Sequence, residues 1–120
     1  MNKILIVDDE DNVRELVKNI ILNYDYTLAG EADNGEEAVE KYKTLTPDLV
    51  ILDILMPGID GVETLKRILQ INPKAKVIML TALEKTQQVK LCLKAGACGY
   101  VAKPFLTEKL ICSIEKVLCS

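Results

Sequence analysis

Short apolar runs alternate along this chain with longer segments in which apolar residues recur every three or four positions. Residues 4–7 and 49–52 are continuous apolar runs, which is the pattern of strands buried on both faces. Residues 13–21 instead place Val13, Leu16 and Ile20 on one side of a helix. The alternation predicts strands at 4–7, 27–31, 49–52, 77–80 and 99–102, and helices around 13–21, 35–45, 60–69, 89–93 and 110–118.

Polar residues and glycine mark where several of these helices begin and end. Asn34 and Asp60 are each followed three residues later by a glutamate, which pairs an N-cap residue with the third position of its helix. Thr107 is the expected N-cap of the last helix, and Gly96 is expected just beyond the end of the preceding one. These signals set the predicted boundaries between helices and loops.

Strands and helices that alternate in this way predict an α/β fold, in which helices cover both faces of a parallel sheet. The chain has 120 residues, of which 49% are hydrophobic and 28% charged, an ordinary composition for a folded domain. A chain of this length forms one domain by default. We therefore expect residues 1–120 to fold as a single three-layer α/β/α domain.

The composition also narrows the range of functions. The chain has no histidine, which excludes Ser-His-Asp catalysis and most zinc hydrolase sites. The net charge of -3 gives no basic surface for nucleic acid, and no apolar run approaches the length of a membrane helix, so neither partner is expected. The cysteines lack C-x-x-C spacing and favour a reducing cytoplasm; they are Cys92, Cys98, Cys112 and Cys119.

Polar residues directly follow four of the expected strands. Asp8 and Asp9 follow the first strand, and Asp53 follows the third; Thr81 and Lys103 follow the fourth and fifth. We expect these side chains to converge, because open parallel sheets bind ligands at the carboxyl ends of their strands. Unit charges about 4 Å apart repel by about 4 kcal/mol at an effective dielectric of about 20, so one lysine cannot neutralise three carboxylates. A divalent cation or a bound proton must offset the remaining charge, and Mg²⁺, which prefers oxygen ligands, is the expected cofactor.

A carboxylate beside Mg²⁺, a lysine and a hydroxyl group suits phosphoryl transfer. A carboxylate can attack phosphorus and become an acyl phosphate. The cation and the Lys103 ammonium would neutralise charge on the phosphoryl oxygens, while Thr81 donates a hydrogen bond. Asp53 is the predicted nucleophile because it stands alone after its strand, whereas Asp8 and Asp9 form a pair suited to holding metal.

Five short motifs resemble those of the bacterial response-regulator receiver domain, of the CheY-like superfamily, over the whole chain. Each motif alone is weak, but their order and spacing are specific. The resemblance implies a flavodoxin-like sheet of strand order 2-1-3-4-5. It also implies that Asp53 accepts a phosphoryl group from the phosphohistidine of a sensor histidine kinase or a histidine phosphotransfer protein. The motifs are ILIVDDE (4–10), DILMPGIDG (53–61), LTA (80–82), KAGA (94–97) and KPF (103–105).

The resemblance assigns roles to individual residues around Asp53. It implies that Mg²⁺ is held by Asp9, Asp53 and the backbone carbonyl of Leu55, with Asp8 acting through water. Lys103 would contact the phosphoryl group. These assignments carry over only at positions where the chain matches the motifs of the family.

The resemblance also implies a conformational switch. The Thr81 hydroxyl would move toward the phosphoryl group and Tyr100 would turn inward. This would change the surface of the fourth helix, fifth strand and fifth helix. That surface would control a downstream protein target or an effector domain outside this chain. A cis peptide bond between Lys103 and Pro104 is implied as well.

Leu55 and Leu83 stand two residues after Asp53 and Thr81, where family members that lose phosphate quickly carry polar side chains that orient water. Both leucines are apolar, so neither can orient a hydrolytic water, and slow self-dephosphorylation is predicted. The chain is therefore expected to be a phosphoacceptor in signalling that promotes only its own phosphorylation and slow dephosphorylation.

Two other classes of protein share parts of this pattern. A haloacid-dehalogenase-type phosphatase also has a D-x-D motif after a strand, which Asp9 and Asp11 supply, but Asn12 follows where that family has glycine. A flavodoxin-like cofactor binder shares the sheet, but the loop after the first strand lacks the Ser, Thr and Gly residues that cradle a phosphate.

The sequence leaves open whether this receiver stands alone or belongs to a longer regulator. Charged residues that pair receivers through the fifth helix are weakly represented here, since that helix carries Cys112, Ser113 and Glu115. We therefore expect a monomer before phosphorylation, with a dimer of the phosphorylated form as the alternative.

Overall fold

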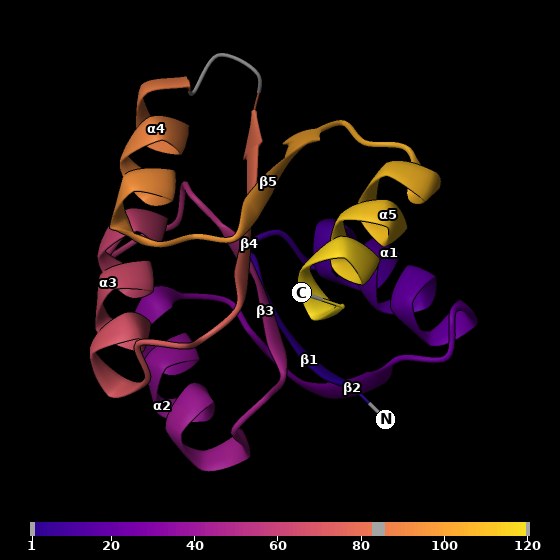
Figure 1. The fold of residues 1–120 in the computed structure, drawn as a ribbon, viewed down its shortest axis with the longest axis horizontal. Helices are drawn as coiled ribbons and strands as arrows, with labels where there is room; N and C mark the ends of the chain where they lie inside the picture. The colour runs from indigo at the N-terminus through magenta and orange to yellow at the C-terminus, as the bar shows by residue number, and fades with distance from the viewer. Residues whose placement is uncertain (1, 83–85, 120) are drawn as a thin grey trace.

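The structure is a computed structural model that describes residues 2–82 and 86–119. One central sheet of parallel strands runs through the molecule, with helices on its two faces (Figure 1). Strands and helices alternate along the chain, as the hydrophobic pattern predicts. The elements are β1 (Lys3–Val7), α1 (Asp11–Asn23), β2 (Thr27–Ala32), α2 (Gly35–Leu45), β3 (Leu49–Asp53), α3 (Gly61–Ile71), β4 (Val77–Ala82), α4 (Thr86–Ala95), β5 (Gly99–Lys103) and α5 (Thr107–Leu118).

The strand order is β2-β1-β3-β4-β5, and every neighbouring pair is parallel. This confirms the flavodoxin-like order. The central strand β3 is buried at every position, because helices cover both faces of the sheet. The register pairs Asp53 with Leu80 on β4, and Ala82 on β4 with Lys103 on β5. The carboxyl ends of these three strands therefore lie side by side.

The sheet separates two hydrophobic cores. Side chains of β1 alternate between them, as in any strand. Ile4 and Ile6 pack with apolar residues of α1 and α5, whereas Leu5 and Val7 pack with those of α2, α3 and α4. Figure 1 shows the same division, with α1 and α5 on one side of the sheet and the other three helices opposite. The fold therefore has the predicted three layers.

Three of the predicted helix boundaries are confirmed. The Asn34 side chain accepts a hydrogen bond from the backbone N–H of Glu37 at 2.8 Å, and Asp60 accepts one from Glu63 at 2.9 Å. Each satisfies an N–H group that has no partner within its helix. Gly96 follows α4 with a φ of +124°, a conformation that favours glycine.

The predicted N-cap of the last helix is wrong. Thr107 is the first residue of α5, and Leu106 occupies the N-cap position with an extended backbone and no capping hydrogen bond from a side chain. The Leu106 carbonyl accepts the N–H groups of Lys109 and Leu110 at 3.0 and 3.2 Å. These bonds start the helix one residue earlier than the threonine signal indicates.

The turn between β3 and α3 brings two backbone segments together at Gly61. A Cβ at this position would lie 2.4 Å from the backbone oxygen of Asp53 and 2.6 Å from the Cα of Ile54. The Gly61 N–H also donates a hydrogen bond to the Ile54 carbonyl at 2.7 Å. Only glycine allows this close approach, which fixes the backbone where β3 ends.

We expect Gly61→Ala to lower the free energy of unfolding by about 1–3 kcal/mol, because the backbone of β3 must shift to admit a methyl group. Gly99→Ala is the matched control, since a Cβ at Gly99 meets nothing within 4 Å. Its effect should stay within about 0.5 kcal/mol. Urea unfolding followed by circular dichroism measures both variants. Equal stabilities would mean that the loop relaxes around residue 61 without cost.

Candidate functional site

Side chains from four strands meet at the carboxyl edge of the sheet. Asp8 directly follows β1, while Asp53 and Lys103 end β3 and β5, and Thr81 is the penultimate residue of β4. A recess opens between these strand ends, which we call the polar hollow. Its lining residues are Asp9, Glu10, Asp53, Ile54, Leu55, Thr81, Ala82 and Lys103.

The ammonium group of Lys103 lies between two buried carboxylates. Its Nζ atom is 2.9 Å from Oδ2 of Asp8 and 3.4 Å from Oδ1 of Asp53. Asp8 is completely buried and Asp53 is 5% exposed. Burial alone lowers the pKa of Lys103, but hydrogen bonds and attraction from the two carboxylates outweigh it, so the pKa is raised. Lys103 is therefore charged at neutral pH.

Asp53 is a carboxyl group poised to titrate near neutrality. Burial raises its pKa from 3.8 to about 6, and the negative charge of Asp8 adds to the rise. Attraction and a hydrogen bond from Lys103, together with a hydrogen bond from the backbone of Leu55, act in the opposite direction. The net rise means that Lys103 does not offset the burial of Asp53 and the repulsion from Asp8.

Three consecutive acidic residues, which we call the acidic trio, follow β1: Asp8, Asp9 and Glu10. One carboxylate oxygen from each of the three residues lies within 4.8 Å of the other two. The backbone N–H of Glu10 donates a hydrogen bond to Oδ1 of Asp8 at 2.9 Å, which orders the turn. Asp9 and Glu10 are exposed and line the polar hollow. This purely oxygen donor set fits Mg²⁺.

Glu10 is the member of this group that sequence analysis did not single out. Its Oε1 atom lies 3.8 Å from Lys103 Nζ, so its charge acts on the same ammonium group. The available signal was a run of four acidic residues after a buried strand, Asp8 to Asp11, of which only Asp8 and Asp9 were considered as metal ligands. Leu55 was expected to offer its backbone carbonyl to a metal, and the residue does line the polar hollow.

Thr81 lies between the polar hollow and a second, apolar recess. It is 3% exposed, and its Oγ1 donates a hydrogen bond to the Ala82 carbonyl at 3.0 Å. Tyr100 is 50% exposed. We call the second recess the apolar hollow; it is lined by Thr81, Ala82, Val89, Lys90, Leu93, Tyr100 and Ala102.

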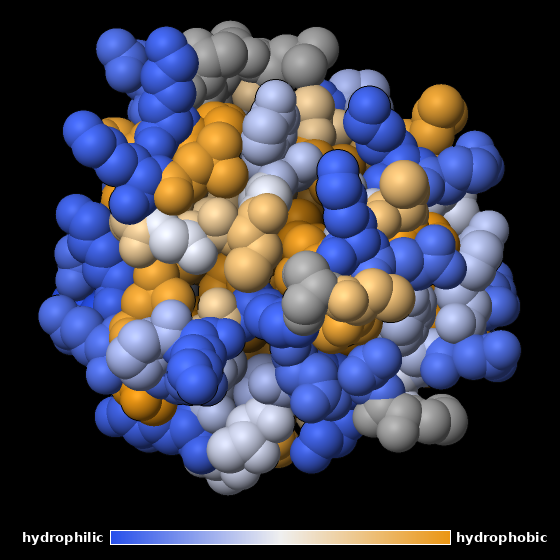
Figure 2. Space-filling model, viewed as in Figure 1, coloured by the Kyte–Doolittle hydropathy of each residue, from blue (hydrophilic) through white to orange (hydrophobic). Residues whose placement is uncertain are grey.

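The surface around the apolar hollow differs from the rest of this side of the molecule. Figure 2 shows apolar side chains gathered over the middle of the view, between α4 and α5, with hydrophilic residues around the periphery. A further recess on the same face is lined by residues of α4, β5 and α5 and by Cys98 of the loop before β5; Leu93, Tyr100 and Val117 are among them. The face on which the sequence analysis expects switching is therefore partly apolar.

Three further expectations concern the Lys103–Pro104 peptide bond, Leu83 and the absence of a membrane helix. The peptide bond between Lys103 and Pro104 is cis, as the resemblance implies. Leu83 lies outside the described residues, so its prediction stays a prediction. In the described part of the chain, no helix combines the length and apolar character needed to cross a membrane.

An open parallel sheet that gathers polar groups at its carboxyl edge is typical of doubly wound α/β proteins. Comparison with known proteins narrows this class. The family model of the response regulator receiver domain matches residues 4–115. The chain therefore belongs to the response-regulator receiver family and is a CheY-like signalling domain of two-component systems.

Individual relatives show how far the similarity extends. The chemotaxis protein CheY of Thermotoga maritima is 44% identical over 115 residues, covering 96% of each chain. A CheY of Borrelia burgdorferi, solved in complex with CheX, BeF3 and Mg²⁺, superposes with a TM-score of 0.93 at 37% identity, covering 97% of this chain and 88% of that one. A putative transcriptional regulator of Pseudomonas aeruginosa is 40% identical, but the match covers 98% of this chain and 57% of the regulator. Relatives thus include short proteins and longer regulators.

We expect Asp53→Asn to stabilise the protein in the absence of metal at neutral pH. Because folding raises the pKa of Asp53 from 3.8 to about 6, ionisation of this group costs stability as the pH rises through that interval. The cost is absent below about pH 4 and complete above about pH 6, where the shift corresponds to at most about 3 kcal/mol.

Urea unfolding in EDTA at about pH 4 and about pH 7 tests this expectation. The stability difference between Asp53→Asn and the wild type should grow with pH. Glu40→Gln, which removes an exposed carboxylate, should show no such growth. A difference that is the same at both pH values would mean that Asp53 ionises in the folded protein without cost.

Proposed function

We propose that Asp53 accepts a phosphoryl group from the phosphohistidine of a sensor histidine kinase or a histidine phosphotransfer protein. The observation that carries this proposal is the buried Asp53 carboxylate, held 3.4 Å from Lys103 Nζ in the wall of a recess that the acidic trio borders. The chain has no histidine, so the donor imidazole must belong to another molecule. A carboxylate oxygen of Asp53 would bond to phosphorus as the phosphorus–nitrogen bond breaks, its electron pair returning to the imidazole.

The residues around Asp53 fit a requirement for Mg²⁺. Asp9, Asp53 and the backbone carbonyl of Leu55 would hold the cation, with Asp8 acting through water. The donor set is entirely oxygen, and Lys103 alone leaves the buried acids with excess negative charge. When bound, Mg²⁺ would neutralise charge on the phosphoryl oxygens. The Mg²⁺ that accompanies CheY in the Borrelia burgdorferi complex supports this assignment.

Lys103 and Thr81 would recognise the transferred group directly. Lys103 is charged and already directed at Asp53, so its ammonium can pair with phosphoryl oxygens that carry increasing negative charge. The Thr81 hydroxyl now donates to the Ala82 carbonyl, and rotation of its side chain would let it donate to a phosphoryl oxygen instead. Asp53 supplies the new bond, and these two residues stabilise the charge that accompanies it.

The movement of Thr81 provides a route from the phosphoryl group to a partner. Thr81 lines both the polar hollow and the apolar hollow, and Tyr100 lines the apolar one. Withdrawal of the threonine toward Asp53 would free space into which Tyr100 turns. The exposed face of α4, β5 and α5 would then change shape, and phosphorylation would shift an equilibrium between two states of that face.

The altered face would control a downstream protein or an effector domain outside this chain, with no direct contact to nucleic acid or membrane. The relatives leave room for both arrangements, since they include a CheY of similar length and a longer putative transcriptional regulator. We propose a monomer before phosphorylation and a cytoplasmic location, where exposed free thiols such as Cys98 and Cys112 remain reduced.

Addition of Mg²⁺ and beryllofluoride, a mimic of the phosphoryl group, tests the proposed chemistry. Amide NMR signals near Asp53, Thr81 and Tyr100 should shift in the wild type, because the mimic occupies the polar hollow and draws Thr81 toward it. Asp53→Asn should show no shifts. Thr81→Ala should keep the shifts around Asp53 and lose those around Tyr100, since it lacks the hydroxyl that links the two hollows.

Each outcome of this experiment has a distinct meaning. A wild type that does not respond would show that the polar hollow is not a competent acceptor site, and the proposal would fail. A Thr81→Ala variant that still moves Tyr100 would leave the acceptor role intact and remove the proposed route of switching.

The lifetime of the acyl phosphate is a separate prediction, which follows from the apolar residues at positions 55 and 83. Leu55 is 50% exposed, yet it offers no group that could orient an attacking water. Phosphate release from phosphorylated wild type should be slow compared with that of fast chemotaxis regulators. Leu55→Asn combined with Leu83→Glu should shorten the lifetime, whereas a wild-type lifetime of seconds would contradict the prediction.

A further inference from the structure

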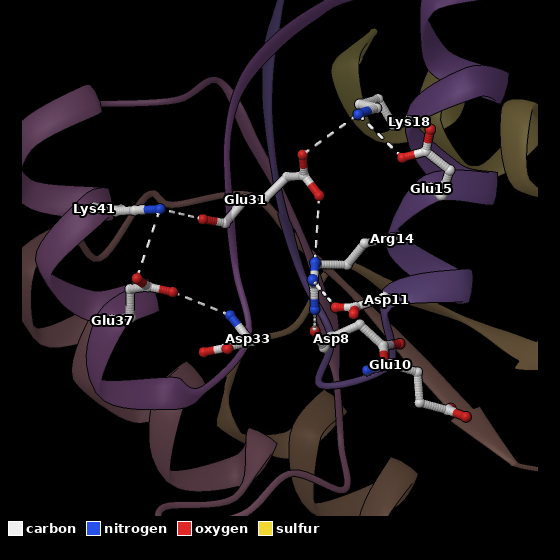
Figure 3. A network of polar contacts seen from close by, with 10 residues as sticks. All are labelled: Asp8, Glu10, Asp11, Arg14, Glu15, Lys18, Glu31, Asp33, Glu37 and Lys41. Atoms are coloured by element: carbon white, nitrogen blue, oxygen red, sulfur yellow. Dashed lines mark hydrogen bonds and ion pairs between the residues drawn. The ribbon is translucent and has the colours of Figure 1, made fainter.

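Arg14 on α1 contacts the backbone of the acidic trio at Asp8. Its Nη1 atom donates a hydrogen bond of 2.6 Å to the carbonyl oxygen of Asp8. Its Nε atom donates to Oε1 of Glu31 on β2 at 3.3 Å, and Nη2 forms an ion pair with Asp11. Figure 3 shows the guanidinium between these partners. The Arg14 side chain is only 16% exposed, so these contacts compete little with water.

The carbonyl that Arg14 binds belongs to the peptide group joining Asp8 to Asp9. Because a peptide group is planar, the direction of this carbonyl sets the plane from which the Asp9 side chain leaves the backbone. The Asp8 side chain in turn accepts the N–H of Glu10 at 2.9 Å. Arg14 therefore holds the peptide group that directly precedes Asp9.

Glu31, the partner of Arg14 on β2, is itself held by contacts with α1 and α2. It also pairs with Lys18 of α1 at 3.7 Å. The backbone carbonyl of Glu31 accepts a hydrogen bond from the Nζ atom of Lys41 on α2. The same Nζ atom lies 3.8 Å from Oε2 of Glu37. Figure 3 shows these contacts as one connected network across α1, β2 and α2. The planar guanidinium, with several donors in a fixed arrangement, is suited to bridging such partners.

A surface arginine elsewhere in the chain provides the contrast. Arg67 pairs with Glu63 one turn away on α3, and their side chains are 42% and 48% exposed. Such exposed pairs contribute little to stability. Arg14 differs in its burial, in the spread of its partners over several elements, and in its hydrogen bond to the backbone of the acidic trio.

We propose that Arg14 is a positioning residue for the proposed Mg²⁺ site, where it orients the Asp8–Asp9 segment; this inference rests on the proposed function. Its charge and its geometry act in opposite directions. A guanidinium near carboxylates repels an incoming cation, so loss of its charge alone would tighten Mg²⁺ binding. Loss of the Asp8 carbonyl contact would release the Asp8–Asp9 peptide and weaken binding. The sign of the change in Mg²⁺ affinity therefore separates the two roles.

The test measures Mg²⁺ affinity by titration calorimetry on the wild type, Arg14→Met, Arg14→Lys and the control Arg67→Met. Arg14→Met should bind Mg²⁺ about 10-fold more weakly, the lower end of the range for residues that orient metal ligands. Arg14→Lys should also bind more weakly, because one ammonium group cannot reproduce the contacts of the guanidinium. Arg67→Met should bind as the wild type does, or slightly more tightly.

A second readout separates positioning from a general loss of stability. In metal-free protein, amide NMR signals of Asp9 and Glu10 should move in both Arg14 variants and stay unchanged in Arg67→Met. Glu31→Gln keeps an acceptor for Arg14 and should weaken Mg²⁺ binding less than Arg14→Met does. Adding Glu31→Gln to Arg14→Met should cause no further weakening, since the two residues act through one contact.

The outcomes keep the two proposals apart. Mg²⁺ binding by Arg14→Met that equals or exceeds that of the wild type overturns the positioning role and leaves the phosphoacceptor proposal in place. A wild type that binds no Mg²⁺ overturns the proposed cation site itself. If Arg14→Met does not fold, Arg14→Lys and Glu31→Gln carry the same comparison, and unchanged affinity in both overturns the inference.

Discussion

One ammonium group shared by two buried carboxylates sets the conditions for the chemistry at the carboxyl edge. Lys103 Nζ lies 2.9 Å from Asp8 and 3.4 Å from Asp53, in a place where neither acid reaches much water. Two negative charges facing one positive charge leave an excess that the protein interior cannot screen. Burial and, after it, the charge of Asp8 raise the pKa of Asp53 despite the attraction of Lys103. An additional cation or a proton at this point is therefore favoured before any phosphoryl group arrives.

The fold sustains this unfavourable arrangement because the elements that carry it cannot easily move apart. The strand β3 that ends in Asp53 is buried along its whole length, with paired strands on either side. Gly61 closes the turn after β3 against the Asp53 backbone, and Arg14 holds the carbonyl of Asp8. Apolar burial in the two cores offsets the electrostatic cost at the edge. The free energy gained by packing the two cores therefore lets the fold keep this unfavourable group of charges at the carboxyl ends of the strands.

Much of this architecture could be predicted from local patterns. Apolar runs of four residues, such as 49–52, predict buried strands. Because parallel strands all end at the same edge of the sheet, the residues that follow these runs lie at that edge. That argument brings Asp53, Thr81 and Lys103 together without any knowledge of distances. Thr107 shows the limit of single-residue signals, because the carbonyl of Leu106 decides where the last helix starts.

Arg14 shows a different limit. It bonds to Glu31, which is 17 residues away on an edge strand, and the contact depends on how that strand pairs with β1. From the sequence alone, the same arginine is indistinguishable from a solvated charge on the outer face of a helix. Glu10 was missed for a related reason, since a run of acids at the start of a helix is also a common surface feature.

The register of the sheet has a consequence for how such a chain can change in length during evolution. Ala82 lies beside Lys103, so a single residue inserted into β5 would turn the lysine to the other face and away from Asp53. The loops at 46–48, 72–76 and 96–98 instead enter the strands at the opposite edge of the sheet. Insertions there lengthen a connection without moving any strand end. Natural variation in chain length should therefore collect on the side of the molecule away from Asp53.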